Sequence, residues 1–281
     1  MIDAPKIDFD SINRGFSAKA LVYDDYGADH PVILWARAQV REHLMALVPT
    51  GAHVLELAAG TGADAVFLAE HGYHVHATDL ADGMVAETRR KIATRGLTGR
   101  LTAQQASFTE LERVTGGPYD LVFSNFGGLN CLPDLTEMTR GLPRVLKPGG
   151  FVTLVIMPPV CPWELVQALR GDFKTAFRRL HRGGVMARVA SAHFMTYYFR
   201  PGQVLQALGP GYRRVALRGL SMFSPPSYLE KFSRSYPKLF RRLTAMDQRF
   251  AGLPLLNAMG DFFILTVQSA RRGATPPDFD H

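Results

Sequence analysis

A carboxylate and two glycines lie close together in VLELAAGTGADA, residues 54–65. Glu56 precedes Gly60 and Gly62, and Gly60 opens a G-x-G-x-x-A pattern that is typical of turns that bind dinucleotides. Glycines at such a turn allow the backbone to approach a ligand closely. Asp79 ends the next apolar run, where a carboxylate accepts hydrogen bonds from both hydroxyls of a ribose. These residue types therefore predict a nucleoside site.

The charge of Glu56 indicates which nucleoside would suit this turn. A carboxylate beside the start of a helix repels a pyrophosphate, which binds helix N-termini through their positive dipole. S-adenosylmethionine has no phosphate, and its α-ammonium and sulfonium groups are both cationic. The two acids Glu56 and Asp79 therefore favour S-adenosylmethionine over NAD.

The elements that would position these acids alternate between strand and helix. Apolar runs of strand length lie at 53–57, 73–78, 101–105, 119–124 and 151–157, and helical spacing occurs at 31–48, 62–71, 83–95 and 135–145. Strands that alternate with helices predict βαβ units and a parallel sheet. Such sheets bind ligands outside the carboxyl ends of their strands, where both acids are expected.

Further motifs follow the glycine turn in order: Asp79-Leu80 with Met84, Ser124-Asn125-Phe126, and Arg144-Val-Leu-Lys-Pro-Gly-Gly150. Together with the turn they resemble the class I, seven-stranded S-adenosylmethionine-dependent methyltransferases. The resemblance covers roughly residues 50–157, and residues 262–268 resemble the reversed last strand of that family. It implies an α/β fold with a doubly wound, mostly parallel, seven-stranded sheet whose last strand is antiparallel, together with inserted segments that cover the substrate.

The resemblance implies S-adenosyl-L-methionine as cofactor and S-adenosyl-L-homocysteine as product. Within it, the glycine turn with Glu56 would hold the methionine end, Asp79 the ribose, and the apolar residues after Asp79 the adenine. Ser107 and Phe108 stand where the family usually has an acid for the adenine amino group, so this chain departs from the pattern there. The expected cofactor-binding residues are Tyr23, Glu56, Ala58, Gly60, Gly62, Asp79, Leu80, Met84, Ser107, Phe108, Ser124 and Asn125.

The chain divides into four expected regions. Residues 1–50 would form a helical cover over the cofactor, and residues 51–157 the cofactor-binding core. Residues 158–210 read as an insertion that covers the substrate, and residues 211–281 as the end of the sheet with a helical lid. Insertions in α/β enzymes gather at the carboxyl ends of strands, so both extra segments are expected near the site.

Motifs define the methyl acceptor less well than the cofactor, because methyl transfer needs alignment more than acid–base chemistry. A general base is required only if the acceptor must lose a proton. His193, within an alternating run at 185–199, and His30, before a helix, are the candidate catalytic bases. A structural role is open for each, on a hairpin surface and at the end of a loop. The candidate substrate-binding residues are Phe126, Tyr197, Tyr198 and Arg178.

No metal site is expected. The chain has two cysteines, Cys131 and Cys161, without a Cys-x-x-Cys pair, which argues against a structural zinc or a disulfide framework. His71, His74 and His76 have ligand-like spacing, but they flank a strand of the cofactor sheet without an arranged carboxylate partner.

The charge of the chain is divided unevenly. Residues 1–150 carry 14 basic and 18 acidic side chains, whereas the rest carries a net charge of +11 within the total of +7. A basic half attracts nucleic acid, an anionic small substrate or an acidic partner, or it is a solvated surface. The N-terminus lacks a secretory pattern, and the apolar runs are too short to span a bilayer. We therefore expect a cytoplasmic protein with no membrane partner.

The expected function is transfer of a methyl group to an oxygen or nitrogen of a small anionic or aromatic molecule, in bacterial biosynthesis. A nucleic-acid methyltransferase is the alternative favoured by the basic half, although no base-amine motif follows Asn125-Phe126. An NAD-dependent oxidoreductase and a non-catalytic scaffold remain as lesser alternatives. The oligomeric state is open, a homodimer being one option.

Overall fold

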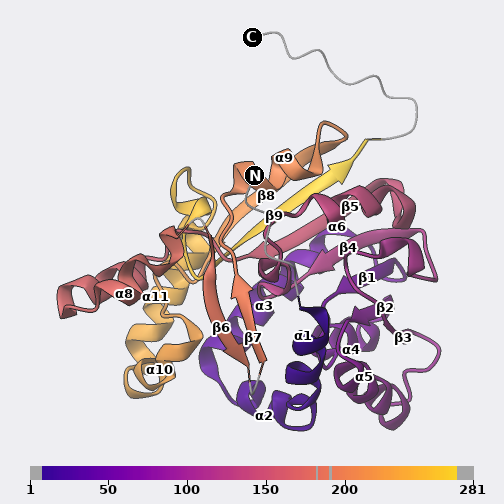
Figure 1. Ribbon diagram of the computed structural model, residues 1–281, viewed down its shortest axis with the longest axis horizontal. Coiled ribbons are helices and arrows are strands. Elements are labelled where there is room, and N and C mark those ends of the chain that lie inside the picture. The colour runs from indigo at the N-terminus through magenta and orange to yellow at the C-terminus, as the bar shows by residue number, and fades with distance from the viewer. Residues whose placement is uncertain (1–7, 182, 190–191, 271–281) are drawn as a thin grey trace.

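A computed structural model of the chain describes residues 8–181, 183–189 and 192–270. Its main sheet has seven strands in the order β3-β2-β1-β4-β5-β9-β8 (Figure 1). The strands are β1 His53–Leu57, β2 His74–Asp79, β3 Leu101–Gln105, β4 Tyr119–Ser124, β5 Leu146–Ile156, β8 Tyr212–Leu220 and β9 Phe262–Ser269. This order confirms the expected α/β fold with a doubly wound sheet.

The first five strands of the order pair in parallel, and β9 is antiparallel to both of its neighbours. β9 lies between β5 and β8, so that β8 joins the sheet only through β9. Thr153 on β5 and Thr266 on β9, 113 residues apart in the chain, share a buried hydrogen bond of 2.9 Å between their hydroxyls. The expectation of an antiparallel last strand is thus confirmed.

Helices cover both faces of the sheet, because alternate side chains of each strand point to opposite sides. On β1, Leu55 and Leu57 pack with one buried cluster that includes residues of α6 Thr136–Val145 and α9 Pro201–Leu208. Val54 packs with the other cluster, which includes residues of α3 Pro31–Leu47 and α4 Ala63–Glu70. The remaining helix of the core, α5 Asp82–Thr94, follows β2.

The N-terminal helices, α1 Phe9–Ser17 and α2 Tyr23–Ala28, are tied to the core. α1 packs beside β7 and α5 (Figure 1). On α2, the carboxylate of Asp24 accepts a hydrogen bond of 2.5 Å from the Thr61 hydroxyl and is also bonded by the ammonium of Lys91. Because Thr61 belongs to the glycine turn, this contact fixes α2 over the turn.

The chain after β5 carries the expected insertions. They include α7 Pro162–Leu165, α8 Phe173–Phe177, the two-stranded sheet of β6 Val185–Val189 and β7 Ala192–Thr196, and, between β8 and β9, α10 Glu230–Ser235 and α11 Pro237–Phe250. The helical pattern over 226–250 is divided at Pro237, which cannot continue the preceding helix and is tolerated in the first turn of α11, where its missing N–H costs no hydrogen bond. Among the described residues, no helix is long and apolar enough to cross a membrane.

Buried ions join α7 and the residues after α8 to the sheet. Arg179 is 4% exposed and bonds Glu164 Oε1 at 2.7 Å and Asp261 Oδ1 at 2.7 Å. Glu164 also receives two bonds from Arg178, and the Trp163 indole N–H donates to Phe223 O at 2.9 Å. The guanidinium groups thus neutralise two buried carboxylates, and part of the positive charge of the C-terminal half serves this internal pairing.

Candidate active site

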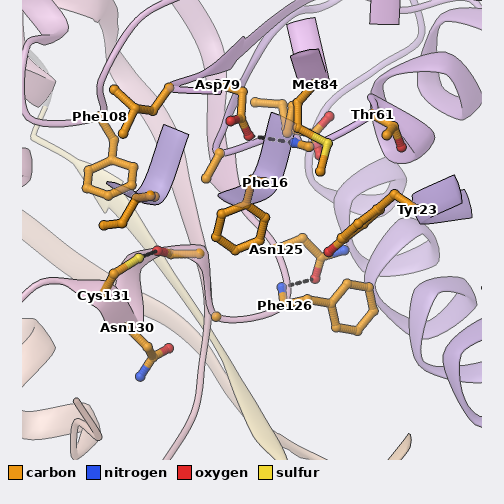
Figure 2. A pocket seen from close by; sticks show the side chains of 18 of the residues that line it. Phe16, Tyr23, Thr61, Asp79, Met84, Phe108, Asn125, Phe126, Asn130 and Cys131 are labelled. Carbon is orange, nitrogen blue, oxygen red and sulfur yellow. Dashed lines mark hydrogen bonds between the residues drawn. The ribbon is translucent and has the colours of Figure 1, made fainter. Parts of the chain in front are cut away.

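A cavity of about 350 Å³ opens at the carboxyl ends of β1, β2 and β4 (Figure 2). It is the place where an open parallel sheet binds its ligands. Helices α1, α2 and α3 and strand β7 contribute further walls. The lining residues are Phe9, Ile12, Phe16, Tyr23, Arg37, Glu56, Ala58, Ala59, Gly60, Thr61, Ala63, Asp64, Asp79, Leu80, Met84, Phe108, Asn125, Phe126, Gly127, Gly128, Asn130, Cys131, Leu132, Met157, Phe194 and Thr196.

The turn after β1 needs its glycines for two different reasons. Both Gly60 and Gly62 have left-handed backbone angles, with φ of 57° and 72°. A Cβ on Gly60 would meet only Tyr23 Cε1, at 3.9 Å, so the backbone there borders open space. A Cβ on Gly62 would lie 2.7 Å from Thr88 Cγ2. Gly60 thus leaves room for a ligand, whereas Gly62 lets the turn pack on α5.

Gly62→Ala should therefore destabilise the fold more than the matched change Gly96→Ala. Gly96 has a similar φ of 67° with nothing within 4 Å of the added Cβ, so its change carries only the backbone cost. At Gly62 the added methyl also collides with Thr88, whose hydroxyl is held by Gly60 O and Met84 O. We expect the free energies of unfolding in urea to differ by about 1–3 kcal/mol. Equal losses in the two variants would contradict this role of Gly62.

Asp79 lies at the end of β2, and both of its carboxylate oxygens accept hydrogen bonds from the backbone. Oδ2 accepts the Gly60 N–H at 2.7 Å (Figure 2), and Oδ1 accepts the Ala81 N–H at 2.8 Å. Burial raises the pKa of this carboxyl, while the bonds from the backbone act to lower it. Since each carboxylate oxygen has more than one lone pair, Asp79 retains acceptors for hydroxyl groups of a ligand in the cavity.

Glu56 is 2% exposed, and its Oε2 is buried without a hydrogen-bond partner among the described residues. Burial raises the pKa of Glu56 well above its usual range, and the nearby charge of Asp64 adds to that rise. Arg37 and Arg41 oppose it. A buried carboxylate oxygen without a partner is costly unless a ligand supplies a donor. The oxygen is therefore suited to a cationic donor in the cavity.

Asp64 forms the ionic support beside Glu56. Its Oδ2 lies 2.6 Å from Arg37 Nη1 and 2.9 Å from Asn125 Nδ2, and its Oδ1 lies 2.7 Å from Arg41 Nε. Burial acts to raise the pKa of Asp64, but the two arginines outweigh it and hold that pKa below its ordinary value. Arg37 and Asp64 both line the cavity, which is thus polar at one end.

The other end of the cavity is mostly apolar. Phe16 and Phe194 approach with ring centroids 5.8 Å apart, and Phe16 and Phe108 both stand in the cavity wall (Figure 2). Cys131 Sγ donates to Gly128 O, and burial raises the pKa of this thiol to about 12. Asn130 is occupied, because its side chain bonds Met157 N and Tyr197 O. None of these described side chains is a base at neutral pH.

The structure brings together most of the residues expected at the cofactor. Ten of the expected cofactor and substrate residues line the cavity: Tyr23, Glu56, Ala58, Gly60, Asp79, Leu80, Met84, Phe108, Asn125 and Phe126. Three expected cofactor residues lie outside its lining. Gly62 packs on Thr88, the Ser107 hydroxyl bonds Thr109, and Ser124 is buried behind the wall. The roles of all these residues remain predictions.

The candidate bases and three of the substrate residues are not in the cavity wall. His30 is fully buried, bonded through Nε2 to Ser227 O at 2.9 Å, and caps α3. His193 is exposed on β7, because alternation along the strand turns Phe194 and Thr196 toward the cavity instead. Tyr197 packs in the core, Arg178 pairs with Glu164, and Tyr198 lies under Arg179.

Several residues of the cavity were not anticipated. Phe16, Arg37, Phe194 and Thr196 come from segments far from the glycine turn in sequence, and only the packing of α1, α3 and β7 brings them there. Asp64 could have been predicted as a cavity residue, because it lies within the G-x-G-x-x-A pattern at the start of α4.

Residues 54–150 match a family model described as a methyltransferase domain. The demethylmenaquinone methyltransferase of Clavibacter sepedonicus is 36% identical over 133 residues, covering 45% of this chain and 49% of that protein. An S-adenosyl-L-methionine-dependent Diels-Alderase, iccD of Talaromyces variabilis, is 31% identical over 109 residues, 38% of this chain and 37% of that protein. The structure of a DhpI–SAH complex superposes with a TM-score of 0.57 at 18% identity, over 93% of this chain and 97% of that one.

Residues 54–150 therefore carry the match to a methyltransferase domain, and the strand order and the position of the cavity agree with the expected resemblance to class I S-adenosylmethionine-dependent methyltransferases. The chain spans about half the length, or less, of the curated relatives named here.

Proposed function

We propose that this protein binds S-adenosylmethionine in the cavity and transfers its methyl group to a small, largely apolar molecule. The observation that carries this proposal is the buried, unpartnered Oε2 of Glu56 beside the open backbone of Gly60. A cation with little bulk at that point satisfies the carboxylate, whereas a pyrophosphate would meet its charge.

The residues present fit the cofactor at its ammonium, carboxylate and ribose hydroxyl groups. Glu56 would accept from the α-ammonium, and Asp79 would accept from the ribose hydroxyls. Arg37, which lines the same end, would face the carboxylate. Leu80 and Met84 offer apolar surface for the adenine. When bound, the cofactor supplies a methyl group on a sulfonium, which is the electrophile of the reaction.

The chain's own contribution to catalysis is then alignment and exclusion of water. Phe16, Phe108 and Phe194 enclose the apolar end of the cavity, and α2 is held over the turn by Asp24. Such enclosure aligns the reactants and removes competing water. Because the described residues at this end include no base, we propose an acceptor whose oxygen or nitrogen is nucleophilic without one.

A small acceptor is favoured over a nucleic acid chiefly by the size of the cavity. The cavity of about 350 Å³ has the size that proteins use for small molecules. Arg178, Arg179 and Arg234 are engaged in ion pairs with acids of the same chain. An aromatic acceptor would match the phenylalanine rings that line the cavity.

S-adenosylhomocysteine should raise the melting temperature, and NAD should not. At a free concentration about a hundred times its Kd, S-adenosylhomocysteine is expected to raise the melting temperature by roughly 5–10 °C. The measurement is a thermal-unfolding scan of the full chain with each ligand. A shift produced by NAD alone would overturn the proposed function.

A further inference from the structure

The segment Pro162–Leu180 carries an unusual amount of exposed apolar surface. It consists of α7, the 3-10 helices Val166–Arg170 and Arg178–Leu180, and α8 between them. We call it the arm; in Figure 1 its helix α8 stands at the edge of the molecule, away from the sheet. Leu169 is 86% exposed and Phe173 61%. The exposed large apolar residues of the arm are Leu165, Val166, Leu169, Phe173, Phe177 and Leu180.

The arm is anchored to the rest of the fold. Its inner side is fixed by Glu164, which is 1% exposed and is bonded by Arg178 and Arg179. Trp163 packs on Phe232 of α10 with ring centroids 5.2 Å apart. On the outer side, Phe173 and Phe177 lie one helical turn apart with stacked rings, at 6.5 Å. The apolar side chains therefore form a defined outward surface on an anchored support.

Basic side chains accompany this surface. Arg170 and Lys174 are exposed in the arm itself, and the carboxylate of Asp172 between them is engaged as the cap of α8. The neighbouring α10 and α11 expose further bases, namely Lys231, Lys238, Arg241 and Arg242. Exposed Phe and Leu beside Lys and Arg are the composition of helices that lie in the surface of an anionic membrane.

We propose that the arm docks on an anionic lipid bilayer, with its phenylalanines and leucines in the headgroup region and its bases against lipid phosphates. Charge argues against a second copy of this chain as the partner, because contact between two arms would bring positive side chains against positive side chains. Only the purpose of this docking rests on the proposed function: a membrane is where a strongly apolar acceptor would reside. From the arm the chain continues through β6 to β7, whose Phe194 and Thr196 line the cavity.

The test is co-sedimentation of the full chain with vesicles of phosphatidylcholine, or of phosphatidylcholine mixed with phosphatidylglycerol. We expect binding to the mixed vesicles, weakened by high salt and by omission of phosphatidylglycerol. The double change Phe173→Glu/Phe177→Glu should weaken binding by about tenfold or more, since it removes apolar anchors and adds like charge to the lipid. Val215→Glu, at a partly exposed residue of the edge strand β8, is the matched control and should bind as the wild type does.

Each other result contradicts the proposal. If the wild type fails to sediment with mixed vesicles, or if the double variant binds equally well, the arm is not a lipid surface. If light scattering shows a dimer that the double variant abolishes, the arm docks on a second copy instead. The vesicle assay uses neither cofactor nor acceptor. A failure here therefore leaves the S-adenosylhomocysteine shift intact, and loss of that shift leaves vesicle binding intact.

Discussion

Asp79→Ala should abolish the rise in melting temperature that S-adenosylhomocysteine produces. In the proposed complex, Asp79 accepts hydrogen bonds from the ribose, and each such charge-assisted bond contributes about 1.5–3 kcal/mol. Loss of both weakens binding by about a hundredfold or more. Isothermal titration calorimetry on the purified variant gives the Kd directly.

The structural role of Asp79 must be separated from its role in binding, because the carboxylate also accepts the Gly60 and Ala81 N–H groups. The melting temperature without ligand reports that structural part. Asp79→Asn keeps the volume and one acceptor, and we expect it to bind with intermediate strength. Glu112→Ala removes an exposed acid outside the cavity and should bind as the wild type does. A folded Asp79→Ala variant with an unchanged Kd would show that the ribose lies elsewhere.

Arg179→Met should cost about 3–5 kcal/mol of the free energy of unfolding at neutral pH. Removal of one partner from a buried ion pair leaves an uncompensated charge, and here Arg179 serves two carboxylates, Glu164 and Asp261. The comparison is Arg213→Met, because Arg213 is exposed and bonds only the side chain of Gln268 among the contacts seen. That control should change stability by less than about 0.5 kcal/mol. Urea unfolding of both variants checks the difference.

The loss in free energy of unfolding that Arg179→Met causes should become smaller as the pH falls from about 7 toward about 4. Burial acts to raise the pKa of Glu164, but the bonds from Arg178 and Arg179 lower it below its ordinary value. A lowered pKa means that the wild type gains stability above the unfolded-state pKa and loses it in acid. In the variant, Asp261 has lost its guanidinium partner and Glu164 keeps only Arg178, so burial is less opposed and both carboxyl groups take up protons at a higher pH than in the wild type. A deficit that is constant across this range would indicate lost packing alone.

The cofactor end of the cavity could be predicted from the sequence because its residues lie at or just after the ends of strands. Glu56 and Asp79 lie at the carboxyl ends of β1 and β2, Gly60 follows β1, and parallel strands end at one edge of the sheet. Arg37 could not be found in this way, because nothing in the 31–48 pattern says which turn of α3 faces the glycine turn. The same holds for Phe194 and Thr196, whose hairpin reaches the cavity through its packing on α1 and on the 3-10 helix Gly128–Cys131.

The two histidines show where residue chemistry misleads without geometry. Histidine is the most frequent general base in enzymes, but a strand places alternate side chains on opposite faces. His193 falls on the face away from the cavity, and His30 is used by the backbone of Ser227. From the sequence we also expected no membrane partner, an expectation that the proposed role of the arm revises.

The position of β9 has a consequence for synthesis on the ribosome. β1 to β5 pair among themselves and can form their sheet as soon as they have left the exit tunnel. β8 emerges earlier than β9 but has no place in the sheet until β9 pairs with β5. The nascent chain must therefore hold β8 and the arm beside an open sheet edge at β5 while residues up to Ser269 are added.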